Sequence, residues 1–195
     1  MAQAFILNVV HFMQRSPKLA ILLVLTVLFA GPTQAQAPGG ELHPPRGFML
    51  LSAARPAGEQ RFLDQKGGTV NLSAFQGRVV LLSLWATWCP SCRQEMMSLD
   101  MLQNLLGSEG LTVLPISVDR RGLAVVAPFY RENELRTLPM FFDPAQKVPK
   151  GLQVSGLPTA LIISRDGWEI GRVSGWRNWM DPQMVIFLRS LLQKP

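Results

Sequence analysis

The spacing of hydrophobic positions changes several times along the chain, and these changes predict alternating strands and helices. Residues 79–85 (VVLLSLW) form a continuous apolar run of strand length, as in strands that are buried on both faces of a sheet. Residues 90–106 instead place apolar side chains three and four positions apart, the spacing of one helical face. Gly107 and Gly110 then predict the end of this helix.

The same patterns continue to the C-terminus and predict an α/β domain. Further strands are expected at residues 61–64, 69–72, 111–118, 138–142, 159–164 and 168–173, with the first two and the last two forming hairpins. Helical segments are expected at residues 72–77, at 122–133 with a break or kink at Pro128, at 144–152 as a helical or irregular connection, and at 182–192. This order predicts a mixed central sheet with helices on both faces.

The N-terminal part of the chain has a different composition. Residues 19–30 (LAILLVLTVLFA) are an unbroken apolar run that follows Arg15 and Lys18 and precedes the small-residue site Ala35-Gln36-Ala37. These features are typical of a secretory signal peptide, so we expect export to the periplasm. The alternative is an uncleaved anchor that retains the protein at the inner membrane, although the run is shorter than the roughly 20 residues of a spanning helix.

The expected organisation has three parts. Residues 1–37 form the signal peptide or anchor, and we expect translation to start at Met13 rather than Met1, because Met13 begins a signal of ordinary length. Residues 38–58 are rich in Pro, Gly, Ala and Arg without periodicity, which predicts a flexible lead-in. The folded domain is expected over residues 59–195.

The charge of the chain gives no sign of a nucleic-acid partner. Lys and Arg number 19 against 13 Asp and Glu, for a formal net charge of +6. Proteins that bind nucleic acids cluster their basic side chains on one face, whereas Arg120-Arg121 is the only adjacent basic pair here. We therefore interpret the charge as solvation of the surface and expect no nucleic-acid partner.

The candidate chemistry is concentrated in residues 82–95 (LSLWATWCPSCRQE), which contain the only two cysteines, Cys89 and Cys92. A bridge between them closes a very short loop and restricts the unfolded chain little, yet an exported protein can form it. At the start of a helix, free N–H groups and the dipole favour a Cys89 thiolate, and Cys92 lies one turn later on the same face. Pro90 suits the first helical turn, where its missing N–H is not needed. The pair therefore predicts a dithiol that opens and closes during electron transfer.

The expected reaction is thiol–disulfide exchange. Cys89 attacks the partner's disulfide, and Cys92 then attacks the Cys89 sulfur and releases the reduced partner; the reverse steps oxidise a dithiol. We expect no metal and no cofactor beyond this disulfide. Tetrahedral zinc needs four ligands, and His11 and His43 both precede the folded part. Haem attachment requires C-x-x-C-H, but Arg93 follows Cys92. An inert cysteine pair remains an alternative.

The segments VVLLSLWATWCPSCRQEM and VSGLPTALIISRDGWEIGR closely resemble the TlpA-like thiol:disulfide interchange proteins of the thioredoxin superfamily, with ResA-like and DsbE-like relatives. The resemblance runs from about Gln60 to Leu192. It implies a thioredoxin-like fold with an N-terminal hairpin extension and a central insertion, for which residues 128–152 have the right place.

The resemblance also implies an activity and partners. We expect a monomeric protein-disulfide reductase that acts on exported proteins with thiols or disulfides, such as apocytochrome c or copper-centre assembly factors, and receives electrons from a membrane donor. A net oxidant or isomerase of the same fold is the first alternative. A Cu(I) carrier is less favoured because Thr87 stands where such carriers often have Met. A thiol peroxidase is a third possibility, but it would need its cysteine in a Thr-rich loop with a supporting Arg, and Trp88-Cys89-Pro90 does not match that setting.

The same resemblance implies roles for individual residues. Pro158 would be a cis-proline beside the redox pair, and Leu157 would present its backbone to the partner. Glu95, three residues after Cys92, would exchange a proton with that thiol. The alternative for Glu95 is a glutamate that only complements the helix dipole. Ser83 departs from the Asp or Asn of related proteins, which gives Glu95 more weight.

The tryptophans divide into three groups by position. Trp88 directly precedes Cys89 and is expected to flank the site as an apolar contact for partners. Trp85, on the predicted strand, is expected in the core. Trp168, Trp176 and Trp179 are dense for one short region, which indicates either packing or a docking face.

Overall fold

The apolar run that begins at Val79 forms the central strand β4 (Val79–Trp85), in which every residue is buried. The computed structural model describes residues 44–193. Strand β4 pairs in parallel with β5 (Leu111–Ser117) and antiparallel with β7 (Thr159–Ile163). Because side chains alternate along a strand, one set packs into the core on one face of the sheet and the other set into the core on the opposite face. The prediction of a strand buried on both faces is confirmed.

Within residues 44–193 the sheet has eight strands, in the order β1-β8-β7-β4-β5-β6-β2-β3. The remaining strands are β1 (Met49–Pro56), β2 (Arg61–Asp64), β3 (Thr69–Asn71), β6 (Phe141–Phe142) and β8 (Trp168–Ser174). The helices are η1 (Leu72–Phe75), α3 (Pro90–Leu106), α4 (Leu123–Glu132), α5 (Lys147–Gly151) and α6 (Pro182–Leu192). Parallel and antiparallel pairs occur together, so the predicted mixed sheet and the predicted hairpin of β2 and β3 are confirmed.

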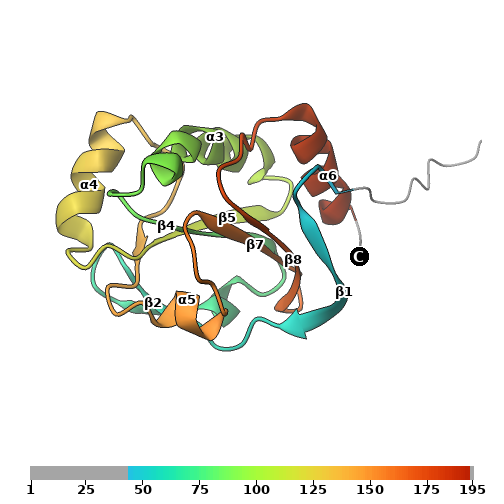
Figure 1. Cartoon of the computed structure of the whole chain (residues 1–195), viewed down its shortest axis with the longest axis horizontal. Helices are drawn as coiled ribbons and strands as arrows, with labels where there is room; N and C mark the ends of the chain where they lie inside the picture. Colours follow the sequence, from blue (N-terminus) through green and yellow to red (C-terminus); the bar gives the residue numbers. More distant parts are fainter. Residues whose placement is uncertain (1–43, 194–195) are drawn as a thin grey trace, which may run out of the picture. The chain divides into compact units, whose positions relative to one another are not determined.

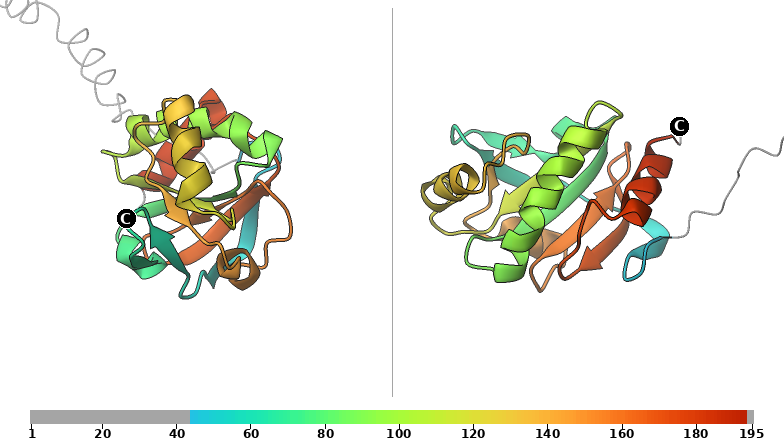
Figure 2. Two further views of the ribbon diagram at one scale, coloured as in Figure 1. Left: turned by 90° about the vertical axis from the view of Figure 1, so that its left-hand side faces the viewer. Right: turned by 90° about the horizontal axis from the view of Figure 1, so that it is seen from above.

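Helices cover both faces of the sheet. Helices α3, α4 and α6 lie on one face, and α5 lies on the other (Figure 1). Seen from above, α3 runs across the sheet between α4 and α6 (Figure 2). The apolar stripe of α3 is buried against the sheet through Met96, Leu99, Leu102 and Leu106. The site at the start of α3 is therefore held by a helix whose apolar face is fully buried against the sheet.

The flexible lead-in predicted over residues 38–58 is wrong for its second half, because β1 pairs with β8 at the edge of the sheet. Most β1 side chains are exposed, so the strand is held by backbone pairing and leaves no hydrophobic alternation for the sequence to reveal. Phe48, just before β1, is buried against Phe187 of α6, with ring centroids 5.1 Å apart.

The predicted signal peptide and the start at Met13 lie outside the described residues. Between residues 44 and 193, no helix has the length and apolar character to cross a membrane.

Two further elements differ from their predicted form. Strand β6 begins at Phe141 rather than at residue 138, because the carboxylate of Asp100 binds the preceding segment instead. One Asp100 oxygen accepts the backbone N–H groups of Arg136, Thr137 and Leu138, at 2.8–3.0 Å. Helix α4 continues through Pro128 without the predicted break.

Candidate functional site

The two cysteines lie where the chain turns from β4 into α3, at the carboxyl end of the central strand. Cys89 is the N-cap residue of α3, and Pro90 occupies the first helical position. The two sulfurs form a disulfide, with Cα atoms 5.2 Å apart. The backbone N–H of Cys92 donates to the Cys89 sulfur at 3.2 Å. This N–H and the dipole of the 17-residue helix would stabilise a thiolate at Cys89.

A groove with a volume of about 480 Å³ opens over Cys89. Its lining includes Trp88, Cys89 and Pro90 at the start of α3 and the segment from Val154 to Leu157. Trp88 is 66% exposed, whereas Cys89 is 5% and Cys92 0% exposed. An incoming molecule therefore meets the sulfur of Cys89 first.

The predicted partner-binding residues come together at this groove. Trp88, Pro90 and Leu157 all line it with Cys89, although Leu157 is more than 60 positions away in the sequence. The Leu157–Pro158 peptide bond is cis, as the resemblance implies. Pro158 itself is buried, and its carbonyl oxygen accepts the N–H of Gly175 at 2.9 Å.

Glu95 lies one turn after Cys92 and is only 1% exposed. The Ser83 hydroxyl donates to one of its carboxylate oxygens at 3.4 Å, and the backbone N–H of Arg177 donates to the other at 3.3 Å. Burial raises the pKa of Glu95 to about 7, and these hydrogen bonds and the Arg177 charge only partly oppose that rise. A carboxyl group with this pKa can both accept and return a proton near neutral pH.

The chain from Arg177 to Trp179 covers Glu95, and this contact was not predicted from the sequence. The backbone N–H of Trp179 donates to the Ser98 hydroxyl at 3.2 Å, and that hydroxyl donates to the carbonyl oxygen of Glu95 at 2.7 Å. The Trp179 indole lies beside the Glu95 carboxyl, but its N–H makes no well-formed hydrogen bond with any described residue. Trp179 is thus a core residue beside the site, whereas Trp168 and Trp176 are about half exposed. Trp85 is fully buried, as predicted.

A second missed residue, Asp119, fixes the loop between β4 and α3. Its carboxylate accepts the backbone N–H of Thr87, the Thr87 hydroxyl and the Ser117 hydroxyl, each at 2.8 Å. The strands β4 and β5 are parallel neighbours, so their carboxyl ends meet at one edge of the sheet. An aspartate directly after the predicted strand at residues 111–118 was the available signal. Through Thr87, Asp119 holds the backbone directly before Trp88.

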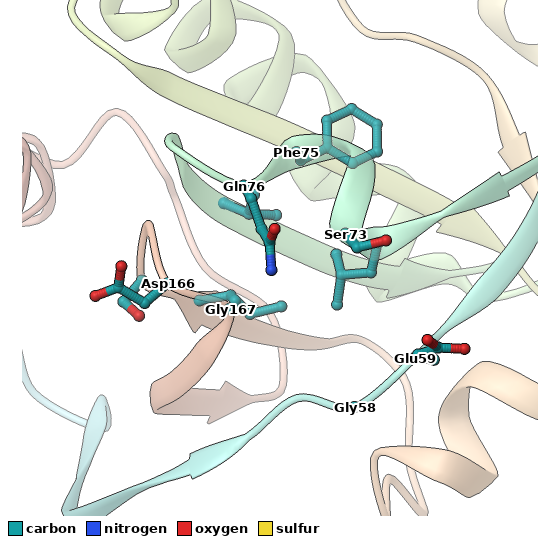
Figure 3. Close-up of a pocket in the computed structure, with 11 residues that line it drawn as sticks. Gly58, Glu59, Ser73, Phe75, Gln76, Asp166 and Gly167 are labelled. Atoms are coloured by element: carbon teal, nitrogen blue, oxygen red, sulfur yellow. The ribbon is translucent and has the colours of Figure 1, made fainter.

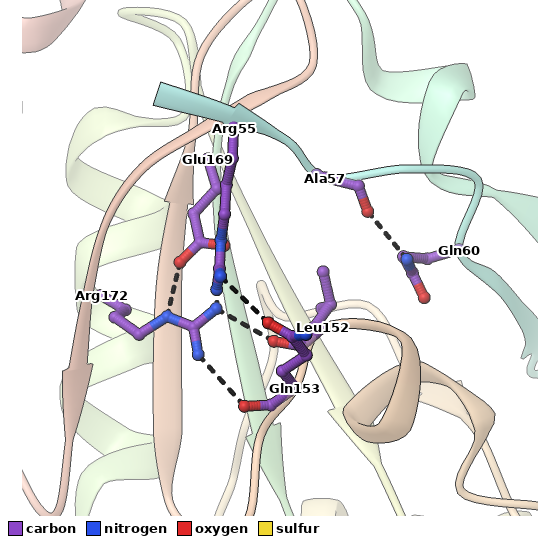
Figure 4. Close-up of polar contacts among 7 residues, drawn as sticks. All are labelled: Arg55, Ala57, Gln60, Leu152, Gln153, Glu169 and Arg172. Atoms are coloured by element: carbon purple, nitrogen blue, oxygen red, sulfur yellow. Dashed lines mark hydrogen bonds and ion pairs between the residues drawn. The ribbon is translucent and has the colours of Figure 1, made fainter. Parts of the chain in front are cut away.

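An ion-pair network around the buried Glu169 holds the chain that leads into the groove (Figure 4). Glu169 of β8 binds Arg55 at 2.8 Å and Arg172 at 2.5 Å. Burial disfavours the charged carboxylate, but hydrogen bonds from these arginines hold the pKa of Glu169 below its usual range. Arg172 also donates to the carbonyl oxygen of Leu152 at 3.0 Å, and Arg55 donates to the side chain of Gln153 at 3.1 Å. The network therefore ties the chain after α5, which leads into the groove wall, to the sheet.

Another hollow lies at the opposite end of β4, between η1 and the turn that joins β7 to β8 (Figure 3). It has a volume of about 270 Å³, and its lining includes Val80, at the beginning of β4, with Gln76 and Asp166. Cys89 follows the other end of the same strand. This hollow is therefore separate from the redox groove.

Comparisons with known proteins give a family and a fold. The model of the AhpC/TSA family matches residues 53–168. The thiol-disulfide oxidoreductase ResA of Bacillus thuringiensis subsp. konkukian is 30% identical over 112 residues, which cover 57% of this chain and 64% of that protein. ResA of Geobacillus kaustophilus is 31% identical over 104 residues, covering 53% and 59%. The chain thus spans slightly less than two thirds of the length of these curated relatives.

Solved structures match a larger part of the chain. A putative thiol:disulfide interchange protein DsbE from Chlorobium tepidum has a TM-score of 0.64 and 26% identity, covering 73% of this chain and 99% of that one. A DsbF homologue from Corynebacterium diphtheriae has a TM-score of 0.61 and 22% identity, covering 80% and 98%. The predicted thioredoxin-like fold is confirmed by these matches.

Proposed function

Because this chain belongs to the AhpC/TSA family, we propose that it is a thiol-disulfide oxidoreductase that reduces disulfides in exported partner proteins. The observation that carries the proposal is the Cys89 sulfur, which caps α3, accepts the Cys92 N–H and faces an open groove. The similarity to the thiol-disulfide oxidoreductase ResA and to a thiol:disulfide interchange protein DsbE supports the same class of reaction.

The reaction proceeds in two exchanges. In the reduced protein, the Cys89 thiolate attacks one sulfur of the partner's disulfide, and the other partner sulfur leaves as a thiolate that takes up a proton. Glu95 then accepts the proton of the Cys92 thiol, and the Cys92 sulfur attacks Cys89 in the mixed disulfide. The second partner sulfur leaves, the Cys89–Cys92 disulfide forms, and two electrons have passed to the partner.

Leu157 supports binding of an extended partner segment in the groove. Among residues 44–193, its backbone makes no hydrogen bond with other backbone groups. Its N–H and C=O are therefore available to pair with a partner strand, as in other cases of β-strand addition. Trp88, which also lines the groove, offers an apolar surface to the same segment.

The direction, the partners and the location complete the proposal. Electrons arrive from a membrane donor, and apocytochrome c or copper-centre assembly factors in the periplasm receive them. The redox equilibrium of the full chain against glutathione tests the direction. A potential of about −270 mV, as in thioredoxin, supports a reductase, whereas one of about −120 mV, as in DsbA, overturns that direction.

A trapping experiment tests the chemistry itself. Cys92→Ser removes the sulfur that resolves the mixed disulfide, so partners should remain attached to Cys89 on non-reducing gels. Cys89→Ser is the matched control and should trap none, because Cys92 is fully buried. Trapping by Cys89→Ser instead would show that the nucleophile is assigned to the wrong cysteine.

A further inference from the structure

The charged side chains around the redox groove have one sign at the surface. The acidic residues of residues 86–93, 118–122 and 143–157 are Asp119 and Asp143, and both are buried. Asp119 binds Thr87 and Ser117, and Asp143 accepts the N–H of Val148 at 2.7 Å. The same segments carry five exposed basic residues, which we call the basic rim: Arg93, Arg120, Arg121, Lys147 and Lys150.

The basic rim has no acidic counterpart in the described part of the chain. The ion pairs within residues 44–193 involve Arg55, Arg61, Arg136, Arg172 and Arg189, and none involves a member of the rim. Arg93 lies over the ring of Phe129, 5.6 Å from its centroid, and keeps its charge available to a ligand. Interspersed charges of both signs would solvate a surface equally well, so the uniform sign at this place needs another explanation.

A further hollow, the arginine hollow, connects Arg120 and Arg121 of the basic rim with the redox groove. It has a volume of about 500 Å³, and its lining includes Arg120, Arg121 and Val125. Asp119 also lines it, but its carboxylate is occupied by hydrogen bonds from Thr87 and Ser117. Trp88, Val118 and Gln146 line both this hollow and the redox groove, so the two adjoin across the exposed indole of Trp88. The turn that carries the two arginines is anchored, because the N–H of Gly122 donates to the carbonyl oxygen of Asp119 at 3.0 Å.

We infer that the basic rim selects partner proteins whose reactive cysteine lies in an extended segment with acidic flanking residues. Guanidinium groups bind carboxylates in a bidentate manner, and complementary charge at the edge of an interface raises the rate of association. The segment would place its cysteine at Cys89, lie against Trp88, and set its carboxylates against Arg120 and Arg121. This inference rests on the proposed function and specifies the partner for that same site.

The test uses the full chain, reduced beforehand and freed of reductant, and two disulfide peptides that differ only in the residues flanking the cysteines, Glu in one and Lys in the other. Thiol alkylation gives the second-order rate constant of reduction in a single turnover. We expect the Glu peptide to react about tenfold faster at low ionic strength, and the preference to shrink towards unity in about 0.5 M salt. Equal rates, or a faster Lys peptide, would overturn the inference.

Charge reversal locates the preference. In the double variant Arg120→Glu/Arg121→Glu, the ratio of the two rate constants should invert in favour of the Lys peptide. The matched control Lys66→Glu/Arg131→Glu makes the same change in net charge at exposed positions that line neither the redox groove nor the arginine hollow, and it should keep the wild-type ratio. An equal effect of both pairs would assign the preference to net charge and reject the basic rim.

An uncharged substrate separates the two proposals. If the wild-type chain fails to reduce 2-hydroxyethyl disulfide, the proposed function fails. If it reduces this compound but does not distinguish the two peptides, the function stands and only the acidic partner is refuted.

Discussion

The buried carboxyl group of Glu95 should make the stability of the fold depend on pH. In the folded chain its pKa is raised from 4.5 to about 7, chiefly because burial removes the hydration of the charged form. In the unfolded chain the carboxyl is solvated and keeps its ordinary pKa. Between these values the folded state binds a proton that the unfolded state has released. The free energy of unfolding therefore falls as pH rises through this window.

The size of the effect follows from the shift. Each pKa unit corresponds to about 1.4 kcal/mol, so a rise from 4.5 to about 7 amounts to about 3 kcal/mol. The contribution of Glu95 to the free energy of unfolding is fully present below the pKa of the unfolded state and is lost once pH passes about 7. Glu95→Gln removes the titrating group while it keeps the shape of the side chain. The stability of wild type relative to Glu95→Gln should thus decrease by about 3 kcal/mol between pH 4.5 and pH 8.

Urea unfolding of the oxidised full chains, followed by tryptophan fluorescence, measures this difference. Each variant is compared with wild type at both pH values, so that the other titrating groups cancel. Glu59→Gln changes an exposed glutamate and serves as the control, with little change in the difference. A difference for Glu95→Gln that stays constant to within about 1 kcal/mol would refute the raised pKa of this group.

Two further substitutions probe the surroundings of the site. The indole N–H of Trp179 lies beside Glu95 and favours its charged carboxylate, which lowers the pKa of Glu95. Trp179→Phe removes this N–H, so the pH midpoint for resolution of the mixed disulfide should rise. Trp85→Phe removes another buried, unpartnered indole N–H, and a shift of the same size in that variant would contradict the role of Trp179. Asp119→Asn replaces an accepting oxygen by a donor and leaves a Thr87 or Ser117 donor unpaired, so urea unfolding should show a loss of about 1–3 kcal/mol. No loss would mean that water replaces the missing acceptor.

Elements that carry a strong local signal could be predicted from the sequence. Strand β4 and helix α3 have the predicted bounds, because a doubly buried strand and an amphipathic helix each leave a clear hydrophobic period. Strand β1 could not be found in this way, since its pairing uses backbone groups that every sequence has. The short β6 depends on Asp100, whose contact with residues 136–138 spans more than 30 positions.

The residues of the candidate site also differ in whether local sequence or tertiary contacts determine their positions. Cys89, Trp88 and Pro90 are neighbours in the sequence, so their common place at the start of α3 follows from local structure. The burial of Glu95 depends on the chain around Arg177, which lies 82 positions away and meets it only through the path of a loop. A helical spacing shows which face a glutamate occupies, but the chain that covers this face is a tertiary feature.

The antiparallel pairing of β1 with β8 also bears on self-association. Without β1, the backbone donors and acceptors along one side of β8 would be exposed as a template for another chain. Strand β1 itself is a poor template, because its register shifts between Leu50 and Arg55 and it ends at Pro56. A chain shortened to begin at residue 59, where the hydrophobic pattern places the domain, would keep both cysteines but leave β8 as a bare edge. Such a truncated protein should aggregate or pair edge to edge through β8. Strand β1, which has no hydrophobic pattern of its own, therefore protects the fold from self-association.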